Sequence, residues 1–148
     1  MMKVKECMSL DVCCCKPDET IKDIAKLMSD NHIGCIPVCD DSKKVLGLVT
    51  DRDIILRSIA CDKDVNSTKV SEIMTTSVCC VEAESDVSNV IRLMSDLQVR
   101  RIPVIENETL VGIVTIGDLA NEQKVSSKEV SDAVEGICNC KANCKNAE

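Results

Sequence analysis

Aromatic side chains are missing from this sequence: its 148 residues include no Phe, Tyr or Trp, and only one His. Any core must therefore be built from Val, Ile, Leu, Met, Ala and Cys, and no base or sugar ring can stack on an aromatic side chain. A single histidine without a paired catalytic motif leaves little for acid–base or nucleophilic chemistry. We therefore expect a protein that is not an enzyme and requires no cofactor.

Basic residues are also in short supply, because 18 Lys and Arg face 25 Asp and Glu and give a net charge of −7. Nonspecific nucleic-acid binding depends on neutralising phosphates, so this balance argues against a nucleic-acid partner. Long apolar runs are missing too. The longest uncharged stretches have nine residues, as in Ile73–Val81, against about 20 for a membrane-spanning helix. The first residues lack the apolar run of a signal peptide, so the expected location is the cytoplasm, with no membrane association.

Cysteine, in contrast, is abundant, with 12 residues. Most of them stand inside apolar runs, where a free thiol behaves as a small hydrophobic side chain, so we interpret them as substitutes for Val or Ala in a reducing compartment. Neighbours in a strand point to opposite faces, so the run Cys13–Cys15 cannot hold one ion. Near the end, Cys138, Cys140 and Cys144 lie within seven residues and form a weak candidate metal or redox site without a local fourth ligand.

The sequence repeats itself. With a shift of 66 residues, the segment Met8–Asp41 aligns with Met74–Asn107, and after a one-residue deletion the shift becomes 65. Such a repeat indicates two copies of one supersecondary unit. Identical pairs begin at Met8, Val12, Cys13, Cys14, Leu27, Met28, Ser29, Asp30, Ile36, Pro37 and Val38, and continue at Gly47, Val49, Thr50 and Asp53.

Each copy is predicted to have the order β-α-β-β-α, because its apolar residues change from strand spacing to helix spacing and back. The expected helix has apolar residues at i, i+3, i+4 and i+7: Ile21, Ile24, Ala25 and Met28 in the first copy, and Val87, Val90, Ile91 and Met94 in the second. Strands are expected over Val12–Cys15, Ile36–Cys39 and Val45–Thr50, and over Val78–Val81, Ile102–Ile105 and Leu110–Thr115, with second helices starting at Asp51 and Ile116.

The predicted fold class is therefore mixed α/β (α+β), with two small three-stranded sheets that carry helices on one side and pack with pseudo-twofold symmetry. The expected domains are residues 1–60 and 69–122, joined by a polar linker over residues 61–68. Residues 123–148 form a tail. Val130, Ala133, Val134 and Ile137 have helical spacing, so the tail should begin as a short amphipathic helix.

Two runs resemble the second half of a cystathionine-beta-synthase (CBS) domain: HIGCIPVCDDSKKVLGLVTDRDI in the first copy and VRRIPVIENETLVGIVTIGDL in the second. The starts CMSLDVCCCKPDETI and IMTTSVCCVEAESDV fit the same pattern, so the resemblance covers roughly residues 3–122. It implies a regulatory module that binds AMP, ATP or another adenosine compound in the cleft between the two copies, is dimeric and has no catalytic activity of its own.

The most informative local pattern is Gly-apolar-apolar-Thr-x-x-Asp, which contains Thr50 and Asp53 in the first copy and Thr115 and Asp118 in the second. The Thr hydroxyl and the first amides of the following helix are expected to hold a phosphate. The Asp, one turn further on, is placed to accept both hydroxyls of a ribose. The same pattern is also a helix capping box, which the fold needs with or without a ligand.

Arg100 and Arg101 precede the strand of the second copy, where the first copy has Gly34 and Cys35. A charge-assisted bond from either arginine to a phosphate is one interpretation, a solvated pair the other. The mismatch between the copies suggests two sites that are not equivalent. Candidate ligand-binding residues from the resemblance are Cys14, Gly34, Cys35, Ile36, Pro37, Thr50, Arg52, Asp53, Cys80, Arg100, Arg101, Ile102, Pro103, Thr115 and Asp118.

Cys14 and Cys80 depart from the family, which commonly has Thr at this pocket position, and a thiol is a weaker hydrogen-bond partner than a hydroxyl. His32, at the end of a predicted helix, is expected to have a capping or surface role. The resulting hypothesis is a homodimeric module that binds an adenine nucleotide and signals by a conformational change to a regulated protein that the sequence does not identify. The alternative is a cysteine-based metal or redox sensor that uses the tail on a CBS scaffold.

Overall fold

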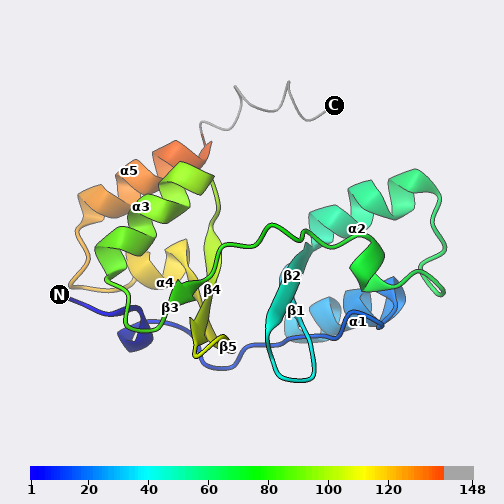
Figure 1. The fold of residues 1–148 in the computed structure, drawn as a ribbon. Coiled ribbons are helices and arrows are strands. Elements are labelled where there is room, and N and C mark those ends of the chain that lie inside the picture. Colours follow the sequence, from blue (N-terminus) through cyan, green and yellow to red (C-terminus); the bar gives the residue numbers. More distant parts are fainter. Residues whose placement is uncertain (139–148) are drawn as a thin grey trace. The chain divides into compact units, whose positions relative to one another are not determined.

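The computed structural model describes residues 1–138. The second copy follows the predicted β-α-β-β-α order, the first copy has the order α-β-β-α, and a further helix ends the described chain (Figure 1). The elements are three 3-10 helices, η1 (Val4–Glu6), η2 (Ile59–Cys61) and η3 (Val70–Glu72), the helices α1 (Ile21–Asn31), α2 (Asp51–Arg57), α3 (Val87–Leu97), α4 (Ile116–Ala120) and α5 (Ser127–Cys138), and the strands β1 (Cys35–Cys39), β2 (Val45–Thr50), β3 (Val81–Glu82), β4 (Arg101–Glu106) and β5 (Thr109–Thr115).

The chain divides into two compact units. The first-copy unit contains Cys13–Val78 and Glu108–Leu110, and the second-copy unit contains Met1–Val12, Cys79–Asn107 and the described residues from Val111 onward. The opening segment of each copy thus belongs to the unit of the other copy. The compact units therefore differ from the two domains that a division at residues 61–68 would give. The domain division of the repeat, with a linker over residues 61–68, stays a prediction.

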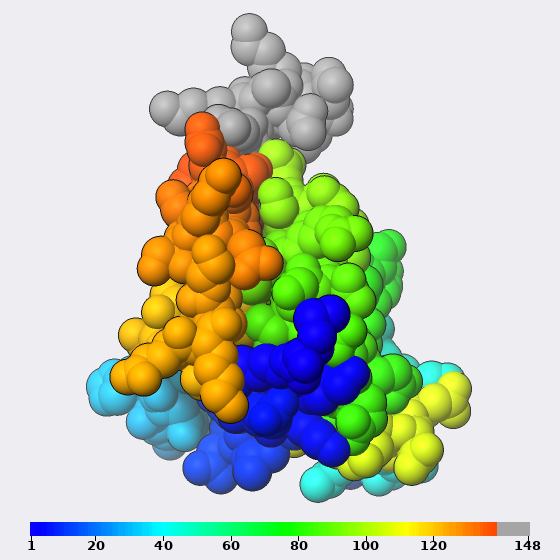
Figure 2. Space-filling model, turned by 90° about the vertical axis from the view of Figure 1, so that its left-hand side faces the viewer, coloured from blue at the N-terminus to red at the C-terminus, as the bar shows by residue number. Residues whose placement is uncertain are grey.

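These two opening segments, here called the arms, are residues 1–12 and 69–78, and they dock in the same way. Val4 and Val70 are fully buried in their respective units. Val4 donates its amide to the carbonyl of Ser85 at 2.9 Å, and Val70 donates to that of Glu19 at 2.8 Å, which is the repeat-equivalent residue. Figure 2 shows the first arm against the residues that precede α3. The two arms therefore occupy equivalent positions in the repeat.

The first-copy sheet has two strands rather than the predicted three. β1 and β2 pair antiparallel, with Ile36 opposite Val49 and a bulge between Val38 and Cys39. The strand predicted over Val12–Cys15 shrinks to a single parallel bridge from Cys15 to Val38. The amide of Val12 bonds to the carbonyl of Leu10 in a tight turn instead of to a neighbouring strand, and only Cys15 pairs with β1.

The second-copy sheet has the predicted three strands in the order β3-β4-β5, with β3 parallel to β4. The prediction of a strand from Val78 to Val81 was wrong in its bounds, because β3 contains only Val81 and Glu82. The amide of Val78 bonds to the carbonyl of Thr76 in a turn instead of to a neighbouring strand.

Helices α1 and α3 confirm the predicted amphipathic pattern. Ile21, Ile24 and Met28 of α1 are buried, as are all four predicted apolar positions of α3. Ala25 is the exception, since it is exposed. His32 ends α1 in the left-handed conformation, with its amide donating to the carbonyls of Met28 and Ser29, which confirms its capping role.

A helix forms in the tail as expected, and it contributes side chains to the core of the second-copy unit. α5 lies alongside α3 in the second-copy unit (Figures 1 and 2). Ala133 and Ile137 on its inner face are buried in the same apolar core as Ile91 and Met94. None of the helices in residues 1–138 is long and apolar enough to cross a membrane.

Candidate functional site

The Thr-x-x-Asp residues form a complete capping box in each unit. Thr50 accepts a hydrogen bond from the amide of Asp53 at 3.1 Å, while the amide of Thr50 donates to Asp53 Oδ2 at 3.0 Å. Thr115 and Asp118 make the same pair of bonds at 3.1 and 3.0 Å. The pattern therefore caps both helices, and a ligand can bind only to atoms of Thr and Asp that make no capping-box hydrogen bond.

The first amides of α2 are not open to a phosphate, contrary to the sequence-based expectation. The amide of Asp51 donates to the carbonyl of Gly34 at 3.0 Å, that of Arg52 to Asp51 Oδ1 at 2.9 Å, and that of Asp53 to Thr50. With seven residues, α2 has only about two turns of aligned peptide dipoles. Any phosphate at this junction has to be held by side chains.

The same correction applies to two of the first three amides of α4, which has five residues. Its first amide, from Ile116, donates to the carbonyl of Arg100 at 2.8 Å, and the amide of Asp118 is bound to Thr115. This bond ties the residue before β4 to the start of α4, so Arg100 and the capping box are held at one corner of the second-copy unit.

The second oxygen of each aspartate is what the capping box leaves over. Asp53 Oδ1 lies 3.7 Å from Nε of Arg57, and the side chain of Asp53 is 13% exposed. In the second-copy unit, Asp118 acts on a thiol of the arm: the pKa of Cys7 is raised to about 11, by burial first and then by the nearby carboxylates of Asp118 and Glu122. Both aspartates are thus half-enclosed acceptors with one oxygen fixed by the backbone.

Gly47 and Gly112, which open the two patterns, are required by the arms. A Cβ on Gly47 would lie 2.7 Å from the carbonyl oxygen of Thr75 and 2.8 Å from the sulfur of Met74. A Cβ on Gly112 would lie 2.7 Å from the sulfur of Met8. Backbone of the arms therefore occupies the space beside both glycines, with the carbonyl oxygens of Thr75 and Ser9 as neighbours. Met8 and Met74 were missed as structural partners, although their identity in the repeat was a usable signal.

The residues directly before β1 and β4 have surroundings of opposite charge in the two units. Beside Gly34 stands the carboxylate of Asp51, whose Oδ2 would be 2.9 Å from a Cβ at that glycine. In the second-copy unit the matching positions are Arg100, which is exposed, and Ile116. Within residues 1–138, neither Arg100 nor Arg101 has an ion-pair partner, so both guanidinium groups are available to an anion.

The apolar residues among the predicted ligand-binding residues are buried in the cores of the two units. Ile36 and Ile102 are buried at 0% and 1% exposure, and Cys35 is buried beside Ile36 in β1. Pro37 uses its carbonyl to pair with the amide of Cys15. These residues, with Pro103 in β4, position the backbone at the corner and are less able to supply polar contacts of their own.

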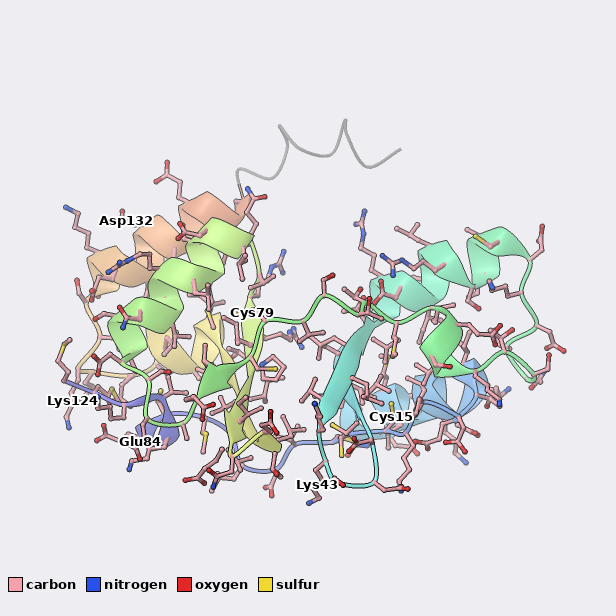
Figure 3. All side chains as sticks on the ribbon, in the orientation of Figure 1. Cys15, Lys43, Cys79, Glu84, Lys124 and Asp132 are labelled. Atoms are coloured by element: carbon pink, nitrogen blue, oxygen red, sulfur yellow. The ribbon has the colours of Figure 1, made fainter. Side chains whose placement is uncertain are left out.

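Cys14 and Cys80 lie on irregular segments. Cys14 is exposed and Cys80 half-buried, and the pKa of Cys80 is raised by burial and by the neighbouring Cys79. Cys14 is the one predicted ligand residue in a pocket of about 450 Å³ in the first-copy unit, where Cys15 lies beside β1 and Lys43 at the hairpin tip (Figure 3). The pocket therefore does not gather the predicted set, and its lining is Cys14, Cys15, Lys16, Asp18, Glu19, Cys39, Asp40, Asp41 and Lys43.

Comparison with known proteins bears directly on the repeat. The family model of the CBS domain matches residues 4–59 and 70–124, one match for each copy. The chain belongs to the CBS domain family. The uncharacterized protein YlbB of Bacillus subtilis (strain 168) is 40% identical over 140 residues, covering 92% of this chain and 94% of YlbB.

Two further proteins that are similar to this CBS-pair protein have been solved with bound ligands. Hypoxic response protein 1 of Mycobacterium tuberculosis (strain ATCC 25618 / H37Rv) is 33% identical over 93% of this chain and 95% of its own. A crystal structure of that protein with two coordinated zinc ions matches with a TM-score of 0.75, at 35% identity over 81% of this chain and 98% of the other. The CBS domain pair of protein MJ0100, solved in complex with 5′-methylthioadenosine and S-adenosyl-L-methionine, matches with a TM-score of 0.70, at 27% identity over 81% and 94% of the two chains.

The described part of the chain offers little to a metal ion. In residues 1–138 no group of three or more His, Cys, Asp or Glu side chains is arranged to hold one. Cys138 is exposed at the end of α5, while Cys140 and Cys144 lie outside the described residues. Cys15 is buried, with its pKa raised to about 12 by burial and then by Glu19 and neighbouring thiols, whereas Cys14 is exposed. The three consecutive cysteines are therefore not one ligand set.

Proposed function

We propose that this CBS-pair protein is a non-catalytic regulatory module that binds an adenosine ligand, AMP, ADP or ATP, and passes the binding event to another protein by a change in conformation. Each capping box contributes one aspartate oxygen to the ribose hydroxyls, and nearby arginines contribute to a phosphate. The location of the ligand in the cleft between the two copies stays a prediction of the family resemblance, as does a homodimeric assembly.

The observation that carries the proposal is the duplicated aspartate with one oxygen bound to the backbone, while the other faces Arg57 in Asp53 and is left over in Asp118. A carboxylate held in this way by its own Thr amide is oriented before any ligand arrives, so ordering it costs no further entropy on binding. A ribose offers two hydroxyl donors to the remaining oxygen positions of Asp53 or Asp118. The adenosyl ligands in the MJ0100 structure support this class of ligand for a chain of the same fold.

The two copies should differ in the ligands that they accept. The second copy combines Asp118 with the unpaired Arg100 and Arg101, which favours a phosphorylated ligand. The first copy has the carboxylate of Asp51 beside Gly34 in place of an arginine, although Arg52 follows it directly. We therefore propose that a phosphate-bearing nucleotide binds first through the second copy.

A ligand panel on the freshly purified, reduced chain tests the proposal. Thermal unfolding is measured with AMP, ADP, ATP, S-adenosylmethionine, NAD and GTP, and every ligand that raises the melting temperature is titrated by calorimetry. A ligand that binds only the native state raises the melting temperature in proportion to its saturation. We expect AMP, ADP or ATP to stabilise the chain and GTP to have less effect. If no adenosine compound shifts the melting temperature or releases heat, the proposal is wrong.

A second candidate function, zinc binding through the tail cysteines, is favoured by the two zinc ions in the structure of hypoxic response protein 1. Cys138, Cys140 and Cys144 would supply three thiolates, with a fourth ligand from elsewhere. Metal analysis of reduced protein purified without chelator distinguishes this function. One zinc per chain that disappears on replacing the three cysteines by serine supports it, and metal-free protein rejects it.

A further inference from the structure

Each copy carries a pair of adjacent cysteines at the same place in the repeat: Cys13 and Cys14 in the first copy, Cys79 and Cys80 in the second. In each pair one thiol is exposed and the other is half-buried, and the exposed members are Cys14 and Cys79. A core role accounts for a buried thiol such as that of Cys15, but not for the exposed thiols of the two pairs. Replacement of Val or Ala in a core therefore does not explain the pairs.

The backbone of both pairs lies outside the two sheets. Before each pair the chain makes the same tight turn, in which the amides of Val12 and Val78 donate to the carbonyl two residues earlier, at 2.9 and 3.0 Å. Sheet pairing starts directly after the pairs, at Cys15 and Val81. Within residues 1–138, the four amides of the pairs donate no backbone hydrogen bond. Figure 3 shows Cys79 on the connecting segment ahead of β3. The dihedral angles of both pairs can therefore change without the loss of a sheet hydrogen bond.

The two thiols of each pair are close enough to influence each other. Burial raises the pKa of Cys13, and the neighbouring thiol of Cys14 raises it further. The pKa of Cys80 is raised in the same way, by burial first and then by Cys79. Adjacent side chains point to opposite faces in a strand, and these residues form none, so the two thiols of a pair can turn toward each other. Cys15 does not compete for this pairing, because it is buried and its pKa is raised to about 12.

We propose that each pair is a redox site, which a hydroperoxide oxidises to a disulfide between adjacent residues and which a dithiol reduces again. The thiolate of the exposed cysteine attacks the outer oxygen of the hydroperoxide, so that an S–O bond forms and the O–O bond breaks. The leaving alkoxide takes up the proton that the thiol released and departs as an alcohol. The neighbouring thiol then attacks the sulfenic acid, an S–S bond replaces the S–O bond, and water leaves with the second thiol proton.

A disulfide between adjacent residues is strained and suits a reversible role. Neighbouring Cα atoms lie about 3.8 Å apart, whereas Cα atoms joined through a disulfide usually lie roughly 4.4–6.8 Å apart. Strain makes the bond easier to reduce, and strained, exposed disulfides are typical of regulatory sites, including those in compartments that keep most thiols reduced.

The place of the pairs in the chain indicates what their oxidation changes. Each pair directly follows an arm, at the point where the chain passes from one compact unit to the other. The strain of the new bond is shared with the tight turn that ends the arm. We therefore expect oxidation to loosen the docking of both arms, which makes each pair a redox switch for its own arm.

Peptide mapping of the full chain tests the second pair without ambiguity. Cleavage by trypsin after Lys69 and Arg92 gives the peptide of residues 70–92, whose only cysteines are Cys79 and Cys80. The reduced chain is treated at neutral pH with graded amounts of hydrogen peroxide, alkylated under denaturing conditions and digested. We expect this peptide to lose two hydrogen atoms and to take up no alkyl group. Treatment with dithiothreitol before alkylation should restore both alkylation sites.

The first pair lies in the tryptic peptide of residues 6–22, which carries four cysteines. After oxidation of the chain, this peptide should be alkylated at Cys7 and Cys15 and should carry the disulfide between Cys13 and Cys14. Fragmentation of the peptide in the mass spectrometer locates the two alkyl groups.

Two variants and one further measurement complete the test. Cys79→Ser removes the exposed thiol of the second pair, so Cys80 should stay open to alkylation after oxidation. The matched control is Cys61→Ser, which removes an exposed thiol that has no adjacent cysteine, and both pairs should still oxidise. In hydrogen exchange, the amides of Ser9 and Thr75, which bond to β5 and β2, should exchange faster in the oxidised chain than in the reduced chain.

Three results would overturn the inference. The first is a chain in which both pairs stay open to alkylation at every amount of peroxide. The second is oxidation that joins a cysteine of either pair to another segment of the chain instead of to its neighbour. The third is a disulfide within the pairs that leaves hydrogen exchange of both arms unchanged, because the bond would then form without acting as a switch.

Discussion

Replacing Asp118 separates ligand binding from helix capping, because one oxygen of this carboxylate serves the backbone and the other is left for a ligand. In Asp118→Ala, the amide of Thr115 loses its 3.0 Å bond to Oδ2 and the ribose loses its acceptor. Loss of the cap should lower the free energy of unfolding by about 1 kcal/mol. Loss of charge-assisted bonds worth about 1.5–3 kcal/mol should weaken nucleotide binding roughly 10- to 150-fold.

Asp118→Asn is the variant that distinguishes the two roles. Its amide oxygen can still accept from the amide of Thr115, so thermal unfolding without ligand should stay near that of the wild type. Its missing charge should still weaken binding in a calorimetric titration. Asp132→Ala, on the exposed side of α5 (Figure 3), removes a carboxylate far from the capping box in the sequence and is the control. If both Asp118 variants bind nucleotide as the wild type does while only Asp118→Ala melts earlier, the aspartate is a cap alone and the site assignment is refuted.

Further outcomes follow from the packing and the thiols. Gly47→Ala should destabilise the chain by about 1–3 kcal/mol in denaturant unfolding, because its Cβ meets the backbone of the arm, whereas Gly117→Ala, with its nearest contact at 3.6 Å, should change stability by less than about 0.5 kcal/mol. Truncation after Glu122 should lower the melting temperature by uncovering the α3 face, and an unchanged melting curve would contradict the packing of α5. Because burial holds the pKa of Cys15 at about 12 instead of 9, the unfolded chain ionises this thiol first, so its contribution to stability is lost as pH rises from 9 towards 12. Mass spectrometry after alkylation at neutral pH should find Cys14 modified and Cys15 protected.

The fold could be predicted from the sequence because two copies of one pattern agree with each other. β2 and the first residues of α2 and α4 lie where apolar spacing and Thr-x-x-Asp place them. The first strand of each copy could not be predicted correctly, since a run of cysteines and valines favours an extended chain but does not say whether a neighbouring strand is within reach. Only Cys15 finds such a neighbour in the first copy.

The sequence also could not predict that each arm packs in the unit of the other copy. Nothing in the spacing of Val4 or Val70 says which copy each will bury itself in, because both copies offer the same docking surface. For the site, the pairing of Thr115 with Asp118 was predictable from the capping-box pattern. The occupied amides at the start of α2 were not, because they depend on the carbonyl of Gly34, 17 residues earlier in the chain.

The central claim, that an adenosine ligand binds at the duplicated Thr-x-x-Asp corners, is tested most directly by a nuclear magnetic resonance titration of the isotope-labelled chain with AMP and ATP. The account predicts saturable shifts of the backbone amides of Asp118 and Thr115, with those of Asp53 and Thr50 following at the same or higher ligand concentration. Spectra that do not change, or that change only at residues remote from both corners, would contradict it.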